Sequence, residues 1–214
     1  MPMDTSLPFF RSATSRGCPL ARAARARWYR DSRVPRVSGN ALARQNMLFH
    51  ISEEANINRF EPRPSEYTSE PVVWAIDDAH LCNYLVPRDC PRVTYYAGPQ
   101  TSDADKEILL ARGSAVVAIE QRWMERIEQC RLYCYSLPDQ TFECLDEGAG
   151  YFVSRGPVVP TGAEVLPDPV SELRRRGVEL RVLPNLWPLR DVVIASSLQF
   201  SIIRMRNALP RKAT

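Results

Sequence analysis

The segment MLFHISEEANINRF, residues 47–60, has the pattern of the first strand and first loop of a folded domain, although 46 residues precede it. It contains His50, one of only two histidines in a chain of 214 residues. His50 stands between Phe49 and Ile51, and successive side chains of a strand point to opposite faces. If Phe49 and Ile51 face the core, His50 therefore faces a cleft or solvent. The alternative is a structural histidine that hydrogen-bonds to a loop.

The 46 residues before this segment differ from the rest in composition. They contain nine Arg, two Asp and no Lys, and they show neither helical nor strand periodicity. Such a segment cannot bury enough apolar surface to offset its ordering entropy, so we expect it to be disordered. It could be a basic arm for nucleic acid or an anionic surface, a targeting peptide, or an extension from an upstream start. The abrupt onset of a foldable pattern favours Met47 as the natural initiator.

The chain from residue 47 onward is mildly acidic, with 19 basic and 23 acidic residues. Its length predicts a single domain over residues 47–208, followed by a short tail, 209–214. The acidic balance argues against a nucleic-acid-binding surface, so nucleic acid is an expected partner only if the 1–46 extension is functional. No run of about 18 apolar residues is present, which argues against a membrane span.

The cysteines do not have the spacing of a metal site. Cys130 and Cys134 are separated by three residues, and no second pair follows at the distance of a zinc ribbon. No signal-peptide pattern is visible, so we expect reduced and mostly buried thiols, a cytoplasmic protein and no bound metal. The six cysteines are Cys18, Cys82, Cys90, Cys130, Cys134 and Cys144.

The order of periodic segments predicts an α+β protein with a mixed central sheet, short helices and a long buried C-terminal helix. Strands and helices intermix without a steady βαβ rhythm, and no Gly-rich phosphate loop of the GxGxxG type is present. We expect strands at 48–52, 71–77, 92–98, 114–120, 131–138, 150–160 and 178–184, and helices at 78–85, 101–113, 121–130, 168–177 and 187–208.

The closing segment, residues 187–208, is apolar almost all round, which is typical of a buried helix. Arg204 and Arg206 would stand at its C-terminal end, where cations complement the carbonyl-rich terminus. The alternative is that one of these arginines reaches the cleft.

Four stretches together resemble an uncharacterised family of small bacterial proteins over residues 47–208. The resemblance implies no activity, but it agrees with Met47 as the start. The stretches are MLFHISEEANINRFEPRPSE (47–66), PVVWAIDDAHLCNYLVPRDCPRVTYY (71–96), GYFVSRGPVVP (150–160) and NLWPLRDVVIASSLQFSIIRMRNA (185–208).

A more distant resemblance is to the ADP-ribosyltransferase fold, carried by LFH-S, I-RF-P, a strand ending in A-D, a helix with a Tyr, and a later hairpin ending in GYFVS. In that fold a first-strand His binds the nicotinamide-side ribose of NAD, a Tyr stacks on nicotinamide, and a Glu supports the oxocarbenium-like transition state. The resemblance implies that His50 is the ribose ligand and Tyr84 a ring platform. Tyr151 stands where the enzymes have Glu, and neither Glu147 nor Glu120 matches the pattern.

RNA 2′-phosphotransferases, which share that fold, use His and Arg in place of Glu. The resemblance therefore leaves open an Arg-dependent transferase that uses Arg88, Arg92 or Arg155. Arg88 and Arg92 lie in PRDCPR, residues 87–92, a loop that two prolines stiffen and that could prearrange an anion site. The alternative is a surface pair of Arg88 and Asp89 beside a buried Cys90, whose pKa the arginines would lower.

The resulting hypothesis is a nucleotide-handling protein of the ADP-ribosyltransferase type. NAD, or a group bearing ADP-ribose or a 2′-phosphate, would bind in a cleft, with His50, Arg88 and Tyr151 as catalytic candidates. The alternative is a non-catalytic binding or interaction module that keeps the fold without the carboxylate. The expected ligand-binding residues are His50, Ser52, Tyr84, Arg88, Arg92 and Tyr151.

Overall fold

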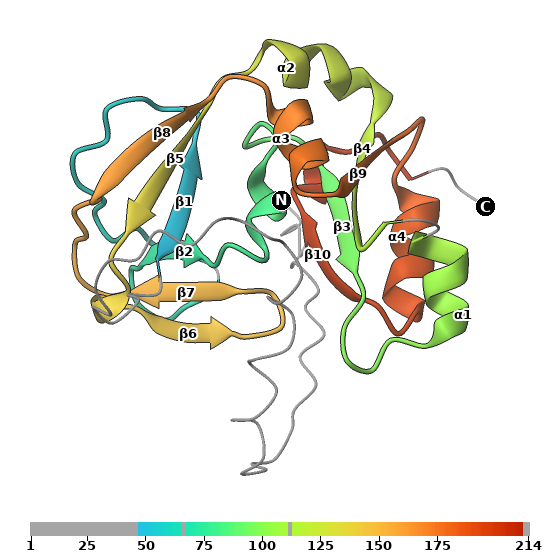
Figure 1. Ribbon diagram of the computed structural model, residues 1–214, viewed down its shortest axis with the longest axis horizontal. Coiled ribbons are helices and arrows are strands. Elements are labelled where there is room, and N and C mark those ends of the chain that lie inside the picture. The colour runs from blue at the N-terminus through green and yellow to red at the C-terminus, as the bar shows by residue number, and fades with distance from the viewer. Residues whose placement is uncertain (1–46, 66, 111–112, 212–214) are drawn as a thin grey trace, which may run out of the picture.

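The computed structural model describes residues 47–65, 67–110 and 113–211, which form two β-sheets with short helices around them (Figure 1). The predictions for residues 1–46 and 212–214 lie outside the described residues. The α+β class is confirmed, because strands and short helices alternate irregularly along the chain.

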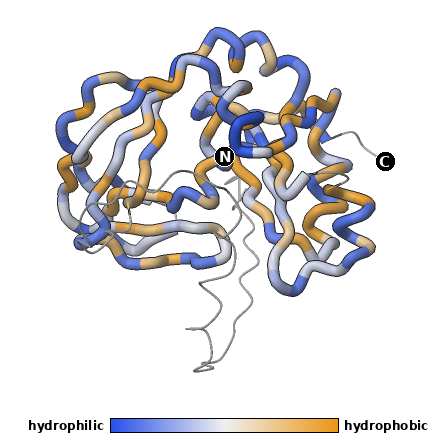
Figure 2. The backbone as a smooth tube through the Cα atoms, in the orientation of Figure 1, coloured by the Kyte–Doolittle hydropathy of each residue, from blue (hydrophilic) through white to orange (hydrophobic). Residues whose placement is uncertain are grey.

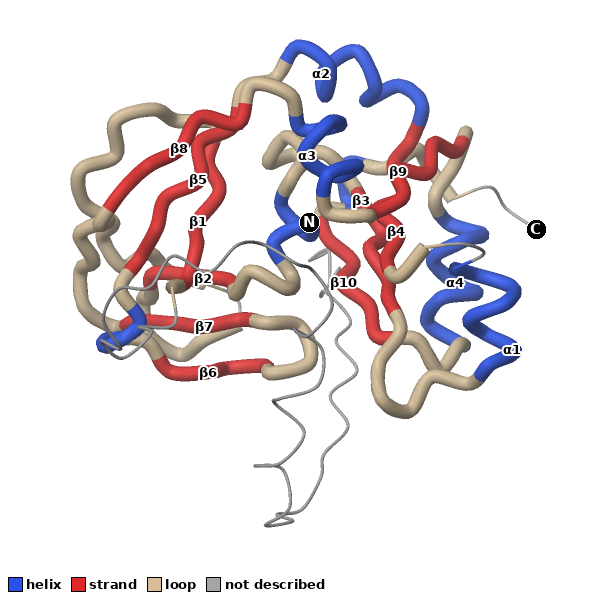
Figure 3. The backbone as a smooth tube through the Cα atoms, in the orientation of Figure 1, coloured by secondary structure: helices blue, strands red, loops and turns tan. Residues whose placement is uncertain are grey.

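The larger sheet is antiparallel throughout, with the strand order β6-β7-β2-β1-β5-β8. β1 and β5 pair over five residues, but β1 and β2 share the single pair Phe49 and Ile76. The two halves of the sheet then diverge, and β2, β7 and β6 run across the direction of β1, β5 and β8 (Figure 3). The strands are β1 Leu48–Ser52, β2 Val73–Ile76, β5 Leu132–Leu137, β6 Glu143–Asp146, β7 Tyr151–Ser154 and β8 Gly162–Leu166.

The smaller sheet is mixed, with the order β10-β3-β4-β9. β4 and β9 are parallel because the chain between them makes a long excursion through the larger sheet, and the other pairs are antiparallel. β4 is fully buried, as its run of apolar residues predicts. The strands are β3 Arg92–Tyr96, β4 Ala115–Glu120, β9 Val178–Leu183 and β10 Gln199–Ile203.

The helices are short, and they lie around the smaller sheet. α1 and α4 lie side by side on its outer face (Figure 1). The α-helices are α1 Asp103–Asp105, continued by a π-helical turn at Lys106–Leu110, α2 Met124–Gln129, α3 Pro169–Arg175 and α4 Trp187–Ala195. The 3₁₀ turns are η2 Leu81–Tyr84, η4 Gln121–Trp123, η5 Asp139–Thr141 and η6 Met205–Asn207.

Three hydrophobic clusters make up the core. The largest contains buried side chains from both sheets and η2, such as Ile76, Leu85 and Val117. A second lies between the smaller sheet and α4, and a third lies on the opposite face of β1, β2 and β5. Figure 2 shows hydrophobic residues concentrated along β3, β4 and α4, whereas α2 is mostly hydrophilic. The first cluster therefore joins the two sheets.

The prediction of one mixed central sheet is wrong, because the strands divide between two sheets. Local sequence does not specify which strands pair when they lie far apart in the chain. β6 and β8 were also not expected. Their residues are mostly exposed and do not alternate between apolar and polar, so they carry no strand signal.

The long C-terminal helix predicted over 187–208 is also wrong, because α4 ends at Ala195 and β10 follows as an edge strand. The hydroxyl of Ser196 donates to the Val193 carbonyl (2.7 Å) and accepts from the Leu198 N–H (3.2 Å). Serine offers the backbone local partners of this kind in place of helical ones.

The residues after Ser196 have the pattern of a strand. Alternate side chains pack into the second cluster, and the β-branched pair at 202–203 favours a strand. An uninterrupted apolar run does not by itself distinguish a buried helix from a helix followed by a strand. The alternating residues are Leu198, Phe200 and Ile202.

No helix of the described residues is long and apolar enough to cross a membrane.

Candidate functional site

His50 lies where β1 and β2 separate. Its Nδ1 is 2.9 Å from the carbonyl oxygen of Trp74 on β2. A carbonyl oxygen can only accept a hydrogen bond, so Nδ1 carries the proton. Phe49 and Ile51 pack against the core between the sheets, and the His50 ring lies on the other face of β1, 4.7 Å from the ring of Phe60. The strand alternation therefore predicts the face of β1 on which His50 lies, but there the ring packs against Phe60 of the third cluster and hydrogen-bonds to backbone, as in the structural alternative.

The surroundings of His50 keep its ring neutral. Burial lowers the pKa of His50 below its ordinary value of 6.5, and the positive charges of Arg88 and Arg63 lower it too, against the opposing effect of the Trp74 hydrogen bond. In the neutral ring, Nε2 has no proton and is an acceptor. No described residue donates a hydrogen bond to Nε2.

Arg88 is exposed, and its backbone holds the loop after η2 against the end of β1. Its N–H donates to Glu53 Oε1 (2.8 Å), and Glu53 Oε2 accepts from Arg126 Nη2 (2.6 Å). Within the described part of the chain, no ion pair joins Arg88 to Asp89. Ser52 has a local role, because its Oγ accepts from the Glu54 N–H (3.0 Å).

Tyr84, Arg92 and Tyr151 lie together between the two sheets, and with Ser201 we call them the tyrosine cluster. The rings of Tyr84 and Tyr151 are 6.2 Å apart, and the Arg92 guanidinium carbon is 5.3 Å from the centre of the Tyr84 ring. The hydroxyls of Tyr151 and Ser201 are 3.0 Å apart, which links β7 to β10. Burial raises the pKa of Tyr84 and of Tyr151, so both hydroxyls stay protonated at neutral pH.

Arg92 is almost completely buried, at 1% exposure, and its guanidinium contacts carbonyl oxygens. Nε donates to Asn83 O (2.8 Å), and Nη1 donates to Cys90 O (2.9 Å), with the carbonyls of Pro87 and Arg88 at 3.4 and 3.3 Å. These bonds hold the loop of residues 83–90. No carboxylate in the described residues forms an ion pair with Arg92, so its charge is met by carbonyl dipoles and by the Tyr84 ring.

The predicted residues therefore lie in two groups. His50 and Arg88 are close enough to interact electrostatically on one side of the larger sheet, and Tyr84, Arg92 and Tyr151 lie between the sheets. Trp74 contacts both groups. Its carbonyl binds His50, and its ring is 5.9 Å from that of Tyr151.

The carboxylates considered as substitutes for the missing Glu lie elsewhere. Glu120 is fully buried, but both of its oxygens accept from the Leu209 N–H (3.0 Å), and Arg122 pairs with it (3.1 Å). Glu147 is exposed in the turn before β7. Arg155 is exposed and pairs with Glu70 and Glu143, outside both groups.

The expectation of mostly buried thiols is confirmed for the described cysteines, but the expected effect of the arginines on Cys90 is wrong. Burial raises the pKa of Cys90 to about 12, outweighing the effect of the neighbouring arginines, so this thiol is inert at neutral pH. Cys144 is exposed, whereas Cys82, Cys90, Cys130 and Cys134 are buried and free. Among the described residues, no three His, Cys, Asp or Glu side chains gather as a metal site would require.

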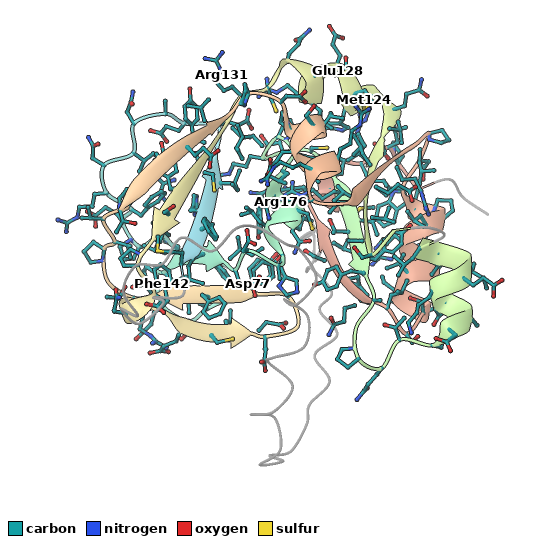
Figure 4. All side chains as sticks on the ribbon, in the orientation of Figure 1. Asp77, Met124, Glu128, Arg131, Phe142 and Arg176 are labelled. Atoms are coloured by element: carbon teal, nitrogen blue, oxygen red, sulfur yellow. The ribbon has the colours of Figure 1, made fainter. Side chains whose placement is uncertain are left out.

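His80, the second histidine, is half-buried. Its side chain is 15% exposed, and its Nδ1 is 2.7 Å from Asp77 Oδ1. The same oxygen accepts from the His80 N–H (2.9 Å), so Asp77 caps the turn that follows β2. The His80 ring packs 5.1 Å from that of Tyr96. Figure 4 shows Asp77 at the inner end of the larger sheet, facing the smaller one.

Sequence reasoning missed Ser201 and Arg63 as members of the two groups. Ser201 fell within the predicted helix, where its partner across the sheets could not be foreseen. Arg63 lies in a Pro-bounded loop, and the only available signal was its position between Pro62 and Pro64.

Comparison with known proteins places the chain without assigning it an activity. No curated protein matches it, and no solved structure matches it. A family model described as a family of unknown function, DUF6886, matches residues 49–208, about three quarters of the chain. This range covers both sheets and both groups of candidate residues, so the chain belongs to the DUF6886 family.

Proposed function

We propose that this protein binds a nucleotide-derived ligand of the NAD or ADP-ribose class, with a ribose hydroxyl at His50 and the phosphates at the arginines beside it. The observation that carries the proposal is the fixed tautomer of His50. Its Nδ1–H is bound to a backbone carbonyl, and its Nε2 is left as an acceptor.

An acceptor nitrogen of this kind suits a hydroxyl donor. A neutral imidazole held by its other nitrogen accepts from a sugar hydroxyl without reorienting. Burial keeps the ring neutral at physiological pH, because it lowers the pKa of His50. The same ring in a charged form would be a donor at both nitrogens and would lose this acceptor.

The charge around His50 suits phosphate. Arg63 and Arg88 both act on it electrostatically, and both side chains are exposed. Guanidinium groups bind phosphate oxygens in a bidentate manner, which a nucleotide diphosphate or a 2′-phosphate can use. The second group supplies aromatic rings: Trp74 and Tyr84, both half-buried, flank Tyr151 and could pack against a base or a nicotinamide.

The proposal is for binding, and ADP-ribosyl or phosphoryl transfer is not part of it. Transferases of the resembled fold stabilise a positively charged sugar with a carboxylate, and such electrostatic stabilisation is often the largest contribution to catalysis. Tyr151 stands at that position, and it is neutral because burial raises its pKa. This favours a binding protein over an enzyme that relies on a glutamate.

The experiment is thermal unfolding of the full chain with NAD, ADP-ribose or a 2′-phosphorylated nucleotide. A ligand that binds only the folded state should add about 2.7 kcal/mol of stability at a hundredfold excess over its dissociation constant. For a domain of this size, that raises the midpoint by roughly 5–10 °C. His50→Ala and Arg88→Ala should each remove most of the shift.

The matched control is His80→Ala, which removes the only other histidine and should keep the full ligand shift relative to its own unliganded midpoint. If none of the three ligands moves the midpoint of the wild-type protein, the proposal fails. It also fails if His50→Ala responds to ligand as strongly as His80→Ala does.

A further inference from the structure

Arg204 has a backbone conformation that is unfavourable for its residue type. Its φ is +56°, in the left-handed region, where a side chain with a Cβ atom is disfavoured. It follows β10 directly and begins the turn η6. Residues held in such conformations persist where the surrounding structure imposes them, and they concentrate at functional sites.

This conformation brings a second positive charge to the tyrosine cluster. Arg204 follows Ile203, which is the register partner of Arg92 in the β10–β3 pair. The charge of Arg204 acts on both Arg92 and Tyr84. Arg204 is half-buried, and no described residue forms an ion pair or a side-chain hydrogen bond with it.

The two arginines repel each other without a compensating carboxylate. Tyr84, Cys90, Tyr151 and Arg204 all act electrostatically on Arg92, and none of them is a carboxylate. Guanidinium groups remain protonated in proteins, so the cluster carries two positive charges. Buried charges are ordinarily paired, and this pairing is missing here.

Buried polar groups beside the arginines are unpaired as well. Thr94 is fully buried, and its Oγ1 has no hydrogen-bond partner. It lies on the same face of β3 as Arg92 and is the register partner of Ser201. Asn83, whose carbonyl binds Arg92, is also fully buried, and both polar atoms of its side chain lack partners. Unpaired groups of this kind are rare in folded proteins, and a bound ion is one of the few explanations for them.

We propose that Arg92, Arg204, Tyr84 and Thr94 form an anion subsite for a phosphoryl group. Two guanidiniums and protonated hydroxyls are all donors, which fits an acceptor-only dianion. Arg92 is already fixed by the 83–90 loop, and Arg204 completes the site from the end of the neighbouring strand β10. The inference is independent of His50, because an inorganic anion alone is enough to occupy the subsite.

The test is the thermal midpoint of the full chain in inorganic phosphate and in pyrophosphate, at constant ionic strength with chloride as the reference. Both anions should raise the midpoint saturably. Arg204→Asn should weaken the apparent affinity about tenfold or more, because it removes a charged donor while Asn still accepts a positive φ. Arg204→Gly serves as a second variant that carries no conformational penalty.

The matched control is Arg206→Asn, because Arg206 is exposed in the same turn and lies outside the cluster. It should retain the wild-type response. His50→Ala should also retain the response to pyrophosphate. A failure of the proposed nucleotide site at His50 can therefore be distinguished from a failure of the anion subsite. The inference is overturned if the wild-type protein shows no saturable response to either anion. It is also overturned if the Arg204 variants respond as Arg206→Asn does.

Discussion

At the scale of single residues, the chain places several groups in arrangements that cost stability. Gly150 is one such residue, and its role is to leave room for neighbouring side chains. Its φ is +69°, and a Cβ added there would lie 2.3 Å from His80 Nδ1 and 2.7 Å from Asp77 Oδ1. The pair of Asp77 and His80 thus occupies the space that a side chain at position 150 would need, and only glycine fits.

We predict that Gly150→Ala lowers the free energy of unfolding by about 3 kcal/mol, because it combines an unfavourable φ with a steric overlap against the His80 and Asp77 side chains. Gly177→Ala is the matched control. Gly177 has the same φ of +69°, but nothing lies within 4 Å of its added Cβ. The control should cost about 1 kcal/mol. Equal losses in denaturant unfolding would contradict a close approach at Gly150.

At the scale of elements, β10 decides which residues can reach the space between the sheets. In a helix, Ser201 and Arg204 would lie on one face about a turn apart, without the strand register that pairs this segment with β3. In the strand, Ser201 faces Tyr151, and Arg204 follows at the strand end beside Arg92. The alternation of side chains along β10 also places Phe200 on the opposite face from Ser201, where it packs beneath α4.

We predict that Phe200→Ala costs about 3–5 kcal/mol, the range for removing a buried aromatic side chain from a core. Ile203→Ala should cost less than half as much, because Ile203 is half-buried and lies on the other face of β10. The measurement is the free energy of unfolding in urea. Similar losses at the two positions would contradict the strand.

At the scale of the whole molecule, Arg176 links the two sheets. It follows α3, which packs against the smaller sheet, and its Nη1 donates to the carbonyl and carboxylate of Asp78, beyond β2, at 3.2 and 2.9 Å. Its Nε donates to Glu172 Oε1 at 2.7 Å. Figure 4 shows Arg176 in the centre of the molecule, between the sheets.

This link makes the stability depend on pH. Hydrogen bonds from Arg175 and Arg176 lower the pKa of Glu172 below its ordinary value of 4.5, with burial acting in the opposite direction. A carboxyl group whose folded pKa is depressed stabilises the protein above its ordinary pKa, and that contribution is lost as the pH falls through the folded pKa.

We predict that Arg176→Gln lowers the stability at neutral pH by about 1 kcal/mol, since the pair is partly solvated. The loss should shrink as the pH falls below about 4.5. Arg174→Gln is the matched control, because Arg174 is exposed on the same helix and forms no ion pair within the described residues. Its stability should follow the wild-type pH profile in calorimetry. A pH-independent loss for Arg176→Gln would contradict the link.

The sequence by itself determined the α+β class, the positions of most strands and the face of β1 on which His50 lies. These features depend on local periodicity and on residue chemistry, and both can be recognised within a single segment of the sequence. The resemblance to the ADP-ribosyltransferase fold also identified Tyr84, Arg92 and Tyr151 as candidate site residues.

Only the tertiary structure decided that the strands form two sheets, that residues 199–203 are a strand, and that Ser201 and Arg204 lie beside Arg92. It also placed Glu120 at Leu209, away from the candidate residues. These outcomes depend on pairing between segments that are far apart in the chain. The free energy of that pairing comes from apolar surface that the segments bury together, so no single segment predicts it.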